Sequence, residues 1–266
     1  MVVTKRQIGA AARDLWTGFA GWRVWHLMAW QEIRQRYRRS LLGPFWLTIS
    51  MAVQMLTMGI VVAILFNQSF GNFLPYVCVG LIFWTMLSGL LNEGATAFVA
   101  SSTFILHMRL PLTAYLLQCV WRNLIIVGHN LVVYVILALI YAIVPSAKMA
   151  LFLLTFPLAL WSISWISLGL AIVSTRFRDL PTIVATGLNV VFWLTPIVYS
   201  PDQLGRHQWL ATANPLAHVL DLIRLPLLNQ VPAPNSFLIV IAMGTIGWTG
   251  AFLLFARFRA RVPFWL

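Results

Sequence analysis

Residues 45–66 read FWLTISMAVQMLTMGIVVAILF and contain no charged side chain. Because about 20 apolar residues in a helix cross the hydrocarbon core of a bilayer, this stretch predicts a membrane-spanning helix. Similar apolar runs follow at about 74–91, 112–144, 149–174, 181–199 and 237–255. The sequence therefore predicts an all-α integral membrane protein with six transmembrane helices, built as a single transmembrane domain over residues 1–266.

The composition agrees with this class of protein. The chain is 61% hydrophobic and 9% charged, with a mean hydropathy of +0.85, whereas soluble domains carry roughly a quarter charged residues. The net charge of +12 could suggest a nucleic-acid partner, but the basic residues lie in short segments between the apolar runs. The charge therefore indicates membrane topology, and no nucleic-acid partner is expected.

The distribution of basic residues predicts that both termini are cytoplasmic. In that orientation only Lys148, Arg206 and Arg224 fall outside, and the positive-inside rule is satisfied at nearly every loop. The basic residues expected on the cytoplasmic side are Lys5, Arg6, Arg13, Arg23, Arg34, Arg36, Arg38, Arg39, Arg109, Arg176, Arg178, Arg257, Arg259 and Arg261.

Two segments outside the long apolar runs have helical patterns of their own. Residues 19–39 carry aromatic and apolar side chains on one side of a helical wheel, which predicts an amphipathic helix in the cytoplasmic interface. Burial of that side against the protein's own spans is the alternative. Residues 200–235 predict short outer helices that dip back into the membrane, with Asn214 capping a helix that starts at Pro215. A surface helix outside the membrane is the alternative here.

The polar residues give little indication of an enzyme. The six acidic residues are scattered, so no pair suits carboxylate catalysis, and the five histidines are far apart. Neither lysine follows a glycine, which excludes the phosphate-binding loop GxxxxGK[ST]. We expect no catalytic residue, metal ligand or cofactor in this chain.

Aromatic residues make up 14% of the chain. Aromatic faces can bind the apolar faces of sugar rings, so Trp46, Phe83, Trp84 and Trp193 are candidates for a carbohydrate translocation path between two copies of the chain. Lipid contact, interfacial placement and core packing are the alternatives.

Four stretches of the sequence resemble one family of membrane proteins. They are RYRRSLLGPFW at Arg36–Trp46, STRFRDLP at Ser174–Pro181, ANPLAHVLDLIR at Ala213–Arg224 and RFRARVPFWL at Arg257–Leu266. Together they look like the polysaccharide-export permeases of ATP-binding-cassette (ABC) transporters, with a tail most similar to that of O-antigen exporters.

The resemblance implies a bacterial inner-membrane homodimer with two ABC ATPase subunits, which would carry the ATP and Mg. The substrate implied is an undecaprenyl-diphosphate-linked polysaccharide moved from the cytoplasmic to the periplasmic side. The family also implies a cytoplasmic coupling helix, placed at 93–107, in which Phe98, Phe104, Ile105 and His107 would contact the ATPase.

The same resemblance gives the basic residues before the first span a possible role. Arg34, Arg36, Arg38 and Arg39 could attract the substrate diphosphate, because arginine pairs bidentately with phosphate oxygens. A role in topology or in contact with anionic lipid explains the same residues.

Other functions stay open at this point. Within transport, export of capsular polysaccharide or teichoic acid is the alternative. A membrane-embedded enzyme of envelope synthesis and a purely structural membrane protein are the alternatives outside transport.

Overall fold

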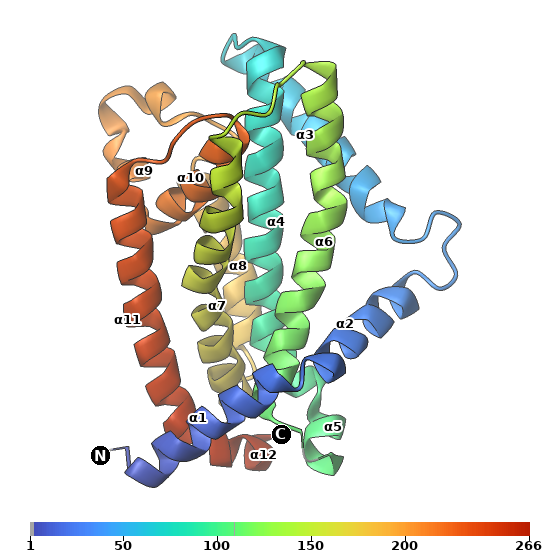
Figure 1. Cartoon of the computed structure of the whole chain (residues 1–266), viewed down its shortest axis with the longest axis vertical. Helices are drawn as coiled ribbons and strands as arrows, with labels where there is room; N and C mark the ends of the chain where they lie inside the picture. Colours follow the sequence, from blue (N-terminus) through green and yellow to red (C-terminus); the bar gives the residue numbers. More distant parts are fainter. Residues whose placement is uncertain (1–2, 109) are drawn as a thin grey trace.

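The computed structural model describes residues 3–108 and 110–266, and this part of the chain is built from helices with no strand (Figure 1). The predicted cytoplasmic position of Arg109 lies outside the described residues. The longer helices are α1 (Lys5–Ala20), α2 (Trp22–Arg36), α3 (Phe45–Leu65), α4 (Phe70–Ala100), α6 (Leu112–Ile140), α7 (Phe152–Arg176), α8 (Leu180–Leu194), α10 (Pro215–Leu227) and α11 (Pro234–Phe258). The short ones are α5 (Ser102–His107), α9 (Trp209–Thr212), α12 (Val262–Trp265), η1 (Met149–Leu151), η2 (Pro201–His207) and η3 (Arg259–Arg261).

Within the described ranges, 5 helices are long and apolar enough to cross a membrane: α3, α4, α6, α7 with η1, and α11 with its C-terminal extension. The predicted fifth span is α8, whose 15 residues reach about 22 Å, less than the roughly 30 Å of hydrocarbon. It ends at Leu194 and not at 199, because Thr195 precedes Pro196 and a residue before proline disfavours the helical conformation. The six-span count therefore stays a prediction.

Helix α4 is the centre of the bundle. Its best apolar window is 67% buried, and the helix packs against α3, α6, α7, α8 and α10. It runs unbroken from Phe70 to Ala100, so the predicted division into a span at 74–91 and a helix at 93–107 was wrong. Glu93 lies within the helix, where its carboxylate is paired with Arg122 of α6. The last part of the predicted helix forms the separate short helix α5, which follows the end of α4.

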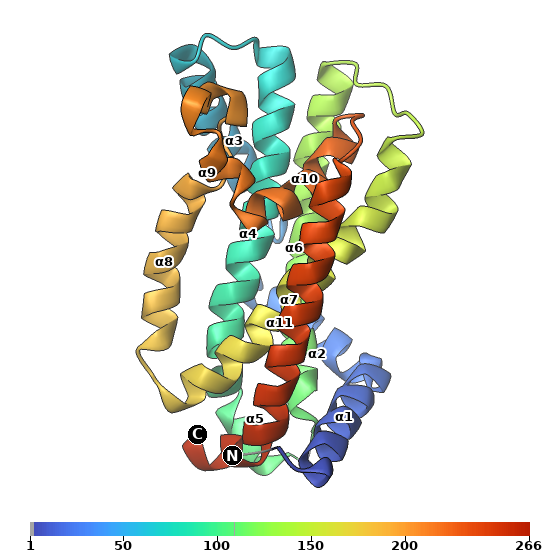
Figure 2. The same cartoon turned by 90° about the vertical axis from the view of Figure 1, so that its left-hand side faces the viewer.

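Both termini lie at one end of the bundle, together with α1, α2, α5 and α12, and we call this the basic end (Figure 1). Figure 2 shows α9 and the connections that precede α4 and α7 at the opposite end. The predicted helix at 19–39 is two helices divided at Gly21, and the first already begins at Lys5, capped by Thr4. Ala29 and Ile33 of α2 are buried on α6, so one face packs on the protein's own spans. Placement of α2 in the membrane interface stays a prediction.

A single carboxylate fixes α1 to the rest of the basic end. Asp14 is buried and accepts hydrogen bonds from the backbone N–H of Thr113, at 3.1 Å, and from the Thr113 hydroxyl, at 2.7 Å. These bonds satisfy donors at the start of α6 that have no partner within that helix. The guanidinium of Arg259, at the end of α11, donates to the same carboxylate at 2.6 Å. Asp14 thereby joins three segments that are far apart in the sequence.

Glycine allows α7 and α11 to pack closely. A Cβ at Gly244 or Gly247 of α11 would overlap the indole rings of Trp161 and Trp165 of α7. Such contacts between small and large residues are typical of helix pairs in membranes, where van der Waals packing and not the hydrophobic effect drives association.

Helix α10 is inserted into the bundle at the opposite end and contacts α4, α7 and α11 (Figure 2). It starts at Pro215, and the Asn214 side chain accepts from the backbone N–H of Leu216 at 2.9 Å, so the predicted cap is confirmed. Most of its apolar side chains are buried, which argues against the alternative of a surface helix. The hydroxyl of Tyr134 on α6 donates to the carbonyl of Leu227 and ties down the end of α10.

Arg224 of α10 is buried and fills the position where α8 stops. Its guanidinium donates to the carbonyl oxygens of Pro196 and Ile197, at 2.7 and 3.1 Å, and lies 3.8 Å from the ring centre of Tyr76 on α4. Gly80 of α4 leaves room for this contact, since a Cβ there would lie 2.5 Å from the Ile197 oxygen. Arg224, predicted to lie on the outer side of the membrane, is a buried residue of the opposite end. It bonds carbonyls that the early end of α8 leaves without helical partners.

Replacing Arg224 by methionine should destabilise the protein. The change removes the donor for two buried carbonyl groups, and we expect a loss of about 2–5 kcal/mol of unfolding free energy. Thermal unfolding of the purified protein in detergent checks this, with a melting temperature several degrees lower than that of the unmodified protein. Arg206→Met is the matched control, because Arg206 is exposed at the same end. Equal melting temperatures for the two variants would contradict the assignment.

Candidate functional site

A cluster of charged and amide side chains joins α2, α4 and α6 at the basic end. Arg122 of α6 forms ion pairs with Glu93 of α4, at 2.7 Å, and with Glu32 of α2. The side-chain amides of Asn123 and Gln118 donate to the same carboxylates, at 2.6 Å to Glu93 and 2.9 Å to Glu32. The cluster thus connects the N-terminal helix pair to two spans through charge-assisted hydrogen bonds.

The burial of each side chain in this cluster determines how much the loss of that side chain should destabilise the protein. The Arg122 side chain is only 8% exposed, whereas the side chains of Glu93 and Glu32 are 21% and 39% exposed. Removing one partner of a buried ion pair is costly because the other charge stays buried without compensation. Loss of Arg122 or Glu93 should therefore disturb the structure more than loss of Glu32, whose carboxylate can be hydrated.

A cavity of about 270 Å³ lies beside the cluster, between α2, the end of α4, α5 and α6. Its lining includes all three charged residues, Tyr115 of α6 and Phe104 of α5. Phe104 is 51% exposed. The cavity is therefore bordered by α2, α4, α5 and α6 together.

The structure separates the residues predicted for ATPase coupling. Phe104 and His107 are exposed on α5, and Ile105 is half-buried against a cluster of apolar side chains at the basic end. Phe98 belongs to α4, is 0% exposed and packs in that same cluster. The prediction that Phe98 contacts a partner is therefore wrong for this conformation, because the side chain is core.

The four arginines before the first span are all exposed. Arg34 of α2 and Arg38 in the turn after it line one cavity of about 230 Å³ together with Gln31 and Gln35. Arg36 is the last residue of the helix, and Arg39 lies in the same turn as Arg38. The structure thus brings Arg34 and Arg38 to one cavity, while their binding of a diphosphate stays a prediction.

Trp84 and Trp193, two of the aromatic residues predicted to line the translocation path, are connected through the ring of Phe192. The ring of Trp84 on α4 meets Phe192 of α8 edge to face at 5.3 Å, and Phe192 meets Trp193 at 5.2 Å. Trp193 is 63% exposed. This row of rings leads from the central helix to the outer face of α8, which a second copy could contact. Trp46 is exposed at the start of α3 and has no ring contact with this row among the described residues.

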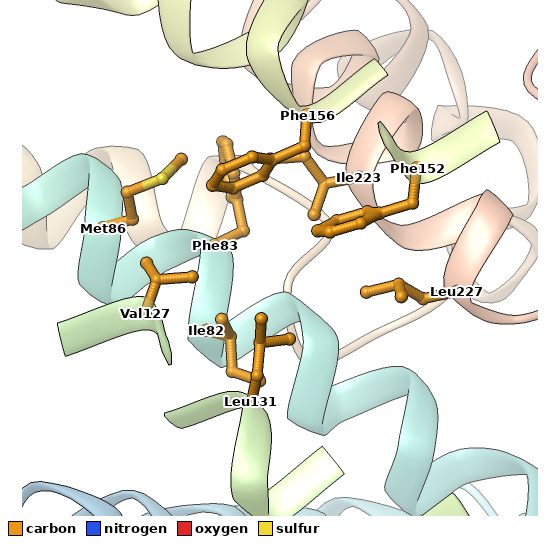
Figure 3. Close-up of a pocket in the computed structure, with 9 residues that line it drawn as sticks. All are labelled: Ile82, Phe83, Met86, Val127, Leu131, Phe152, Phe156, Ile223 and Leu227. Atoms are coloured by element: carbon orange, nitrogen blue, oxygen red, sulfur yellow. The ribbon is translucent and has the colours of Figure 1, made fainter. Parts of the chain in front are cut away.

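Phe83 has a different environment. Figure 3 shows it on α4 among side chains from α6, α7 and α10, pointing into a small apolar gap. It is 1% exposed, and its neighbours include Val127, Phe156 and Ile223. Phe83 therefore packs the interior of one copy, and the expectation that it lines a channel between two copies is wrong for this structure.

Sequence reasoning missed the role of Arg122, Glu93 and Glu32. Arg122 and Asn123 are polar residues within the apolar run at 112–144, but nothing near them in the sequence identifies their partners. The available signal was the opposite charge of Glu93 in the preceding helix, since ionisable residues inside membrane helices usually pair with one another. Arg224 could have been noticed in the same way, as a charge in an apolar helix.

In the described part of the chain, groups of three or more His, Cys, Asp or Glu residues that could hold a metal ion do not occur. Cys78 and Cys119 are both buried and free. The candidate site is built from charge pairs and exposed aromatic rings.

Comparison with known proteins places these features in one family. Residues 23–228, from α2 to just beyond α10, match the family described as ABC-2 type transporter. The chain is 29% identical over 200 residues to the O-antigen export system permease protein RfbA of Myxococcus xanthus, covering 71% of this chain and 74% of that protein. It is 22% identical over 202 residues to the O-antigen export system permease protein RfbA of Klebsiella pneumoniae, with the same coverage of 71% and 74%.

The family match covers most of the chain and includes the Glu32–Arg122–Glu93 cluster, the cavity at α5 and the ring row at α8. On this basis the chain belongs to the ABC-2 type transporter family, as a multi-pass membrane permease.

Proposed function

We propose that this chain is the transmembrane subunit of an ATP-driven exporter of O antigen. Its substrate would be an undecaprenyl-diphosphate-linked polysaccharide that crosses the bacterial inner membrane from the cytoplasmic to the periplasmic side. The similarity to two permeases named for O-antigen export, over 71% of the chain, is the observation that carries this proposal. A long hydrophilic polymer needs a continuous path, because its polar groups cannot cross hydrocarbon unaided.

The energy would come from a separate subunit. We infer a homodimer of this chain with two ABC ATPases that bind ATP and Mg, while the permease itself performs no hydrolysis. In the proposed orientation the basic end lies in the cytoplasm. The arginines on α1, on α2 and in the segment just before α12 support this orientation, as does the sparse positive charge at the opposite end. In that orientation α5 faces the compartment where the ATPase works.

The cluster at the basic end suggests how ATPase movement reaches the membrane. Helix α5 follows directly from α4, and α4 is joined through Glu93 and Arg122 to α6 and, through Glu32, to α2. A push on α5 would therefore displace three helices together, since the ion pairs bind them into one unit. Because α4 continues to the opposite end and contacts α8, the same helix could carry the displacement to the row of aromatic rings.

Deletion of the gene tests the export function. We expect surface O antigen to vanish while lipid-linked polymer accumulates in the cytoplasm, because the subunit supplies a path and not a synthetic reaction. Immunoblots of intact cells and of lipid extracts measure the two pools, with the plasmid-borne gene as the complementation control. If polymer synthesis itself stops while the glycosyltransferases are intact, an envelope-synthesis enzyme becomes the better explanation. Loss of a capsule or teichoic acid in place of O antigen would reassign the substrate.

Phe104→Glu tests the contact with the ATPase. The exposed ring would be replaced by a charge at the rim of the cavity, so we expect ATP hydrolysis to lose its stimulation by the permease while the permease stays folded. Copurification and ATP turnover of the reconstituted complex measure this. Phe264→Glu is the matched control, because Phe264 is an aromatic residue at the same end that is 88% exposed.

A second variant distinguishes binding of the ATPase from transmission of its movement to the membrane helices. Glu32→Gln keeps Phe104 available but removes one ion pair of Arg122, so we expect normal copurification with reduced coupling of hydrolysis to export. Full stimulation and full export in both Phe104→Glu and Glu32→Gln would overturn the proposed route.

Single cysteines at Val53 of α3 and Val190 of α8 test the dimer axis. Both positions are exposed, and we expect at least Val190→Cys to crosslink between copies if the path lies there. Leu238→Cys and Ile246→Cys on α11 are controls with similar exposure.

Alanine variants test which aromatic residues line the path. Trp84→Ala and Trp193→Ala should lower export of long polymer more than they lower basal ATP hydrolysis, whereas Phe83→Ala should lower thermal stability. Crosslinks confined to α11, with full export by both tryptophan variants, would contradict the location.

A further inference from the structure

A pocket at the basic end brings together two of the four sequence stretches described above, Ser174–Pro181 and Arg257–Leu266. It has a volume of about 380 Å³ and lies between the ends of α7 and α11, bordered by the C-terminal helix α12. Arg176 and Phe177 of Ser174–Pro181 form one side, and Phe258, Arg261 and Trp265 of the C-terminal stretch form the other. Neither stretch has a role in the coupling cluster or in the row of aromatic rings.

The lining of the pocket changes from apolar to basic along the bundle axis. Ile172, Val173 and Leu254 line its inner part, where two helices long enough to span a membrane run side by side. Arg176 and Arg261 are at the outer part and are both exposed. An amphipathic molecule would fit this gradient, with hydrocarbon against the inner wall and an anionic group beside the arginines.

The two arginines are held by aromatic rings and not by acids. The Arg176 guanidinium lies 5.9 Å from the ring centre of Trp265, and that of Arg261 lies 5.8 Å from the ring centre of Phe258. The ion pairs among the described residues involve Arg122 and Arg259, so Asp179, the one acid in either stretch, does not neutralise them at contact distance. Cation–π contacts orient a guanidinium over a ring and leave N–H donors for an anion.

A further bond positions the aromatic wall. Arg178 donates from its guanidinium to the backbone carbonyl of Trp265 at 3.1 Å. This bond ties α12 to the connection that follows α7, and the Trp265 side chain lines the pocket. Tryptophan at this level is typical of the boundary between hydrocarbon and headgroups.

We propose that this pocket binds the phosphate headgroup of an anionic membrane phospholipid, with an acyl chain along the groove between α7 and α11. Basic pockets between membrane helices on the cytoplasmic side are known to recognise such headgroups, and arginine matches phosphate geometry. The cavity beside Arg34 and Arg38 differs from this pocket, because its lining residues, Gln31, Arg34, Gln35 and Arg38, include no aromatic ring to hold the arginines. The inference does not depend on which polymer the protein exports.

Native mass spectrometry of the full-length, delipidated protein in detergent tests the site. The probes are phosphatidylglycerol, phosphatidylcholine, undecaprenyl diphosphate and inorganic phosphate. We expect phosphatidylglycerol to bind roughly tenfold or more better than phosphatidylcholine, and the double variant Arg176→Gln with Arg261→Gln to lose that preference. The variant Arg6→Gln with Arg13→Gln removes the same charge from exposed positions on α1 and should bind within about twofold of the unmodified protein.

The remaining outcomes distinguish the possible occupants. Arg176→Lys with Arg261→Lys should keep most of the preference, and the melting temperature of every variant checks that it is folded. Equal binding of the two phospholipids, or retention by the double glutamine variant, would overturn the proposal. Binding of undecaprenyl diphosphate without phosphatidylglycerol would make the pocket a substrate site, and equally tight inorganic phosphate would make it a simple anion site. Both results would also overturn the assignment to a phospholipid.

Discussion

Hydrocarbon offers no water to bond with a backbone N–H or C=O group, so each such group in a membrane helix bundle needs a partner within the protein. Most of this chain meets the requirement with continuous helices. The exception is the segment after α8, where Pro196 prevents the helix from continuing and carbonyl groups are left without helical donors. Arg224 supplies those donors from α10, and Tyr76 reinforces them by donating to the carbonyl of Tyr199 at 3.0 Å. The insertion of α10, the short α8 and the close approach at Gly80 all depend on this junction.

At the basic end, charged side chains are likewise paired with partners within the protein. The chain has only six acidic residues, and Asp14, Glu32 and Glu93 are all in ion pairs that join separate helices. Exposed surface pairs contribute little to stability, but these carboxylates also accept hydrogen bonds from backbone or amide groups and are partly or fully buried. The scarce acids therefore determine how α1, α2 and the end of α11 are attached to the bundle.

Helix α4 connects the two ends. Tyr76 and Gly80 near its start contact the Arg224 junction, and Glu93 near its other end belongs to the charge cluster beside α5. Its middle carries Trp84, the first ring of the row that leads to Trp193. A rigid helix with partners at both ends is a suitable element for linking a movement at α5 to the packing of α8. This arrangement gives the proposed exporter a physical route between its ATPase contact and its path.

The sequence alone determined the class of protein, the helical content, the approximate limits of most long helices and the family, because uncharged runs of about 20 residues and short motifs are local properties. The cap at Asn214 is likewise a local feature that the sequence predicted. The tertiary structure decided which polar residues are partners. Arg122 lies 29 residues from Glu93 and 90 from Glu32, and Arg224 lies 27 from Ile197, so no local pattern pairs them. It also separated Phe83 and Phe98, which are core, from Trp193 and Phe104, which are exposed. An apolar ring reads the same in the sequence whether it packs inside a bundle or faces lipid, because in a membrane both environments are hydrocarbon.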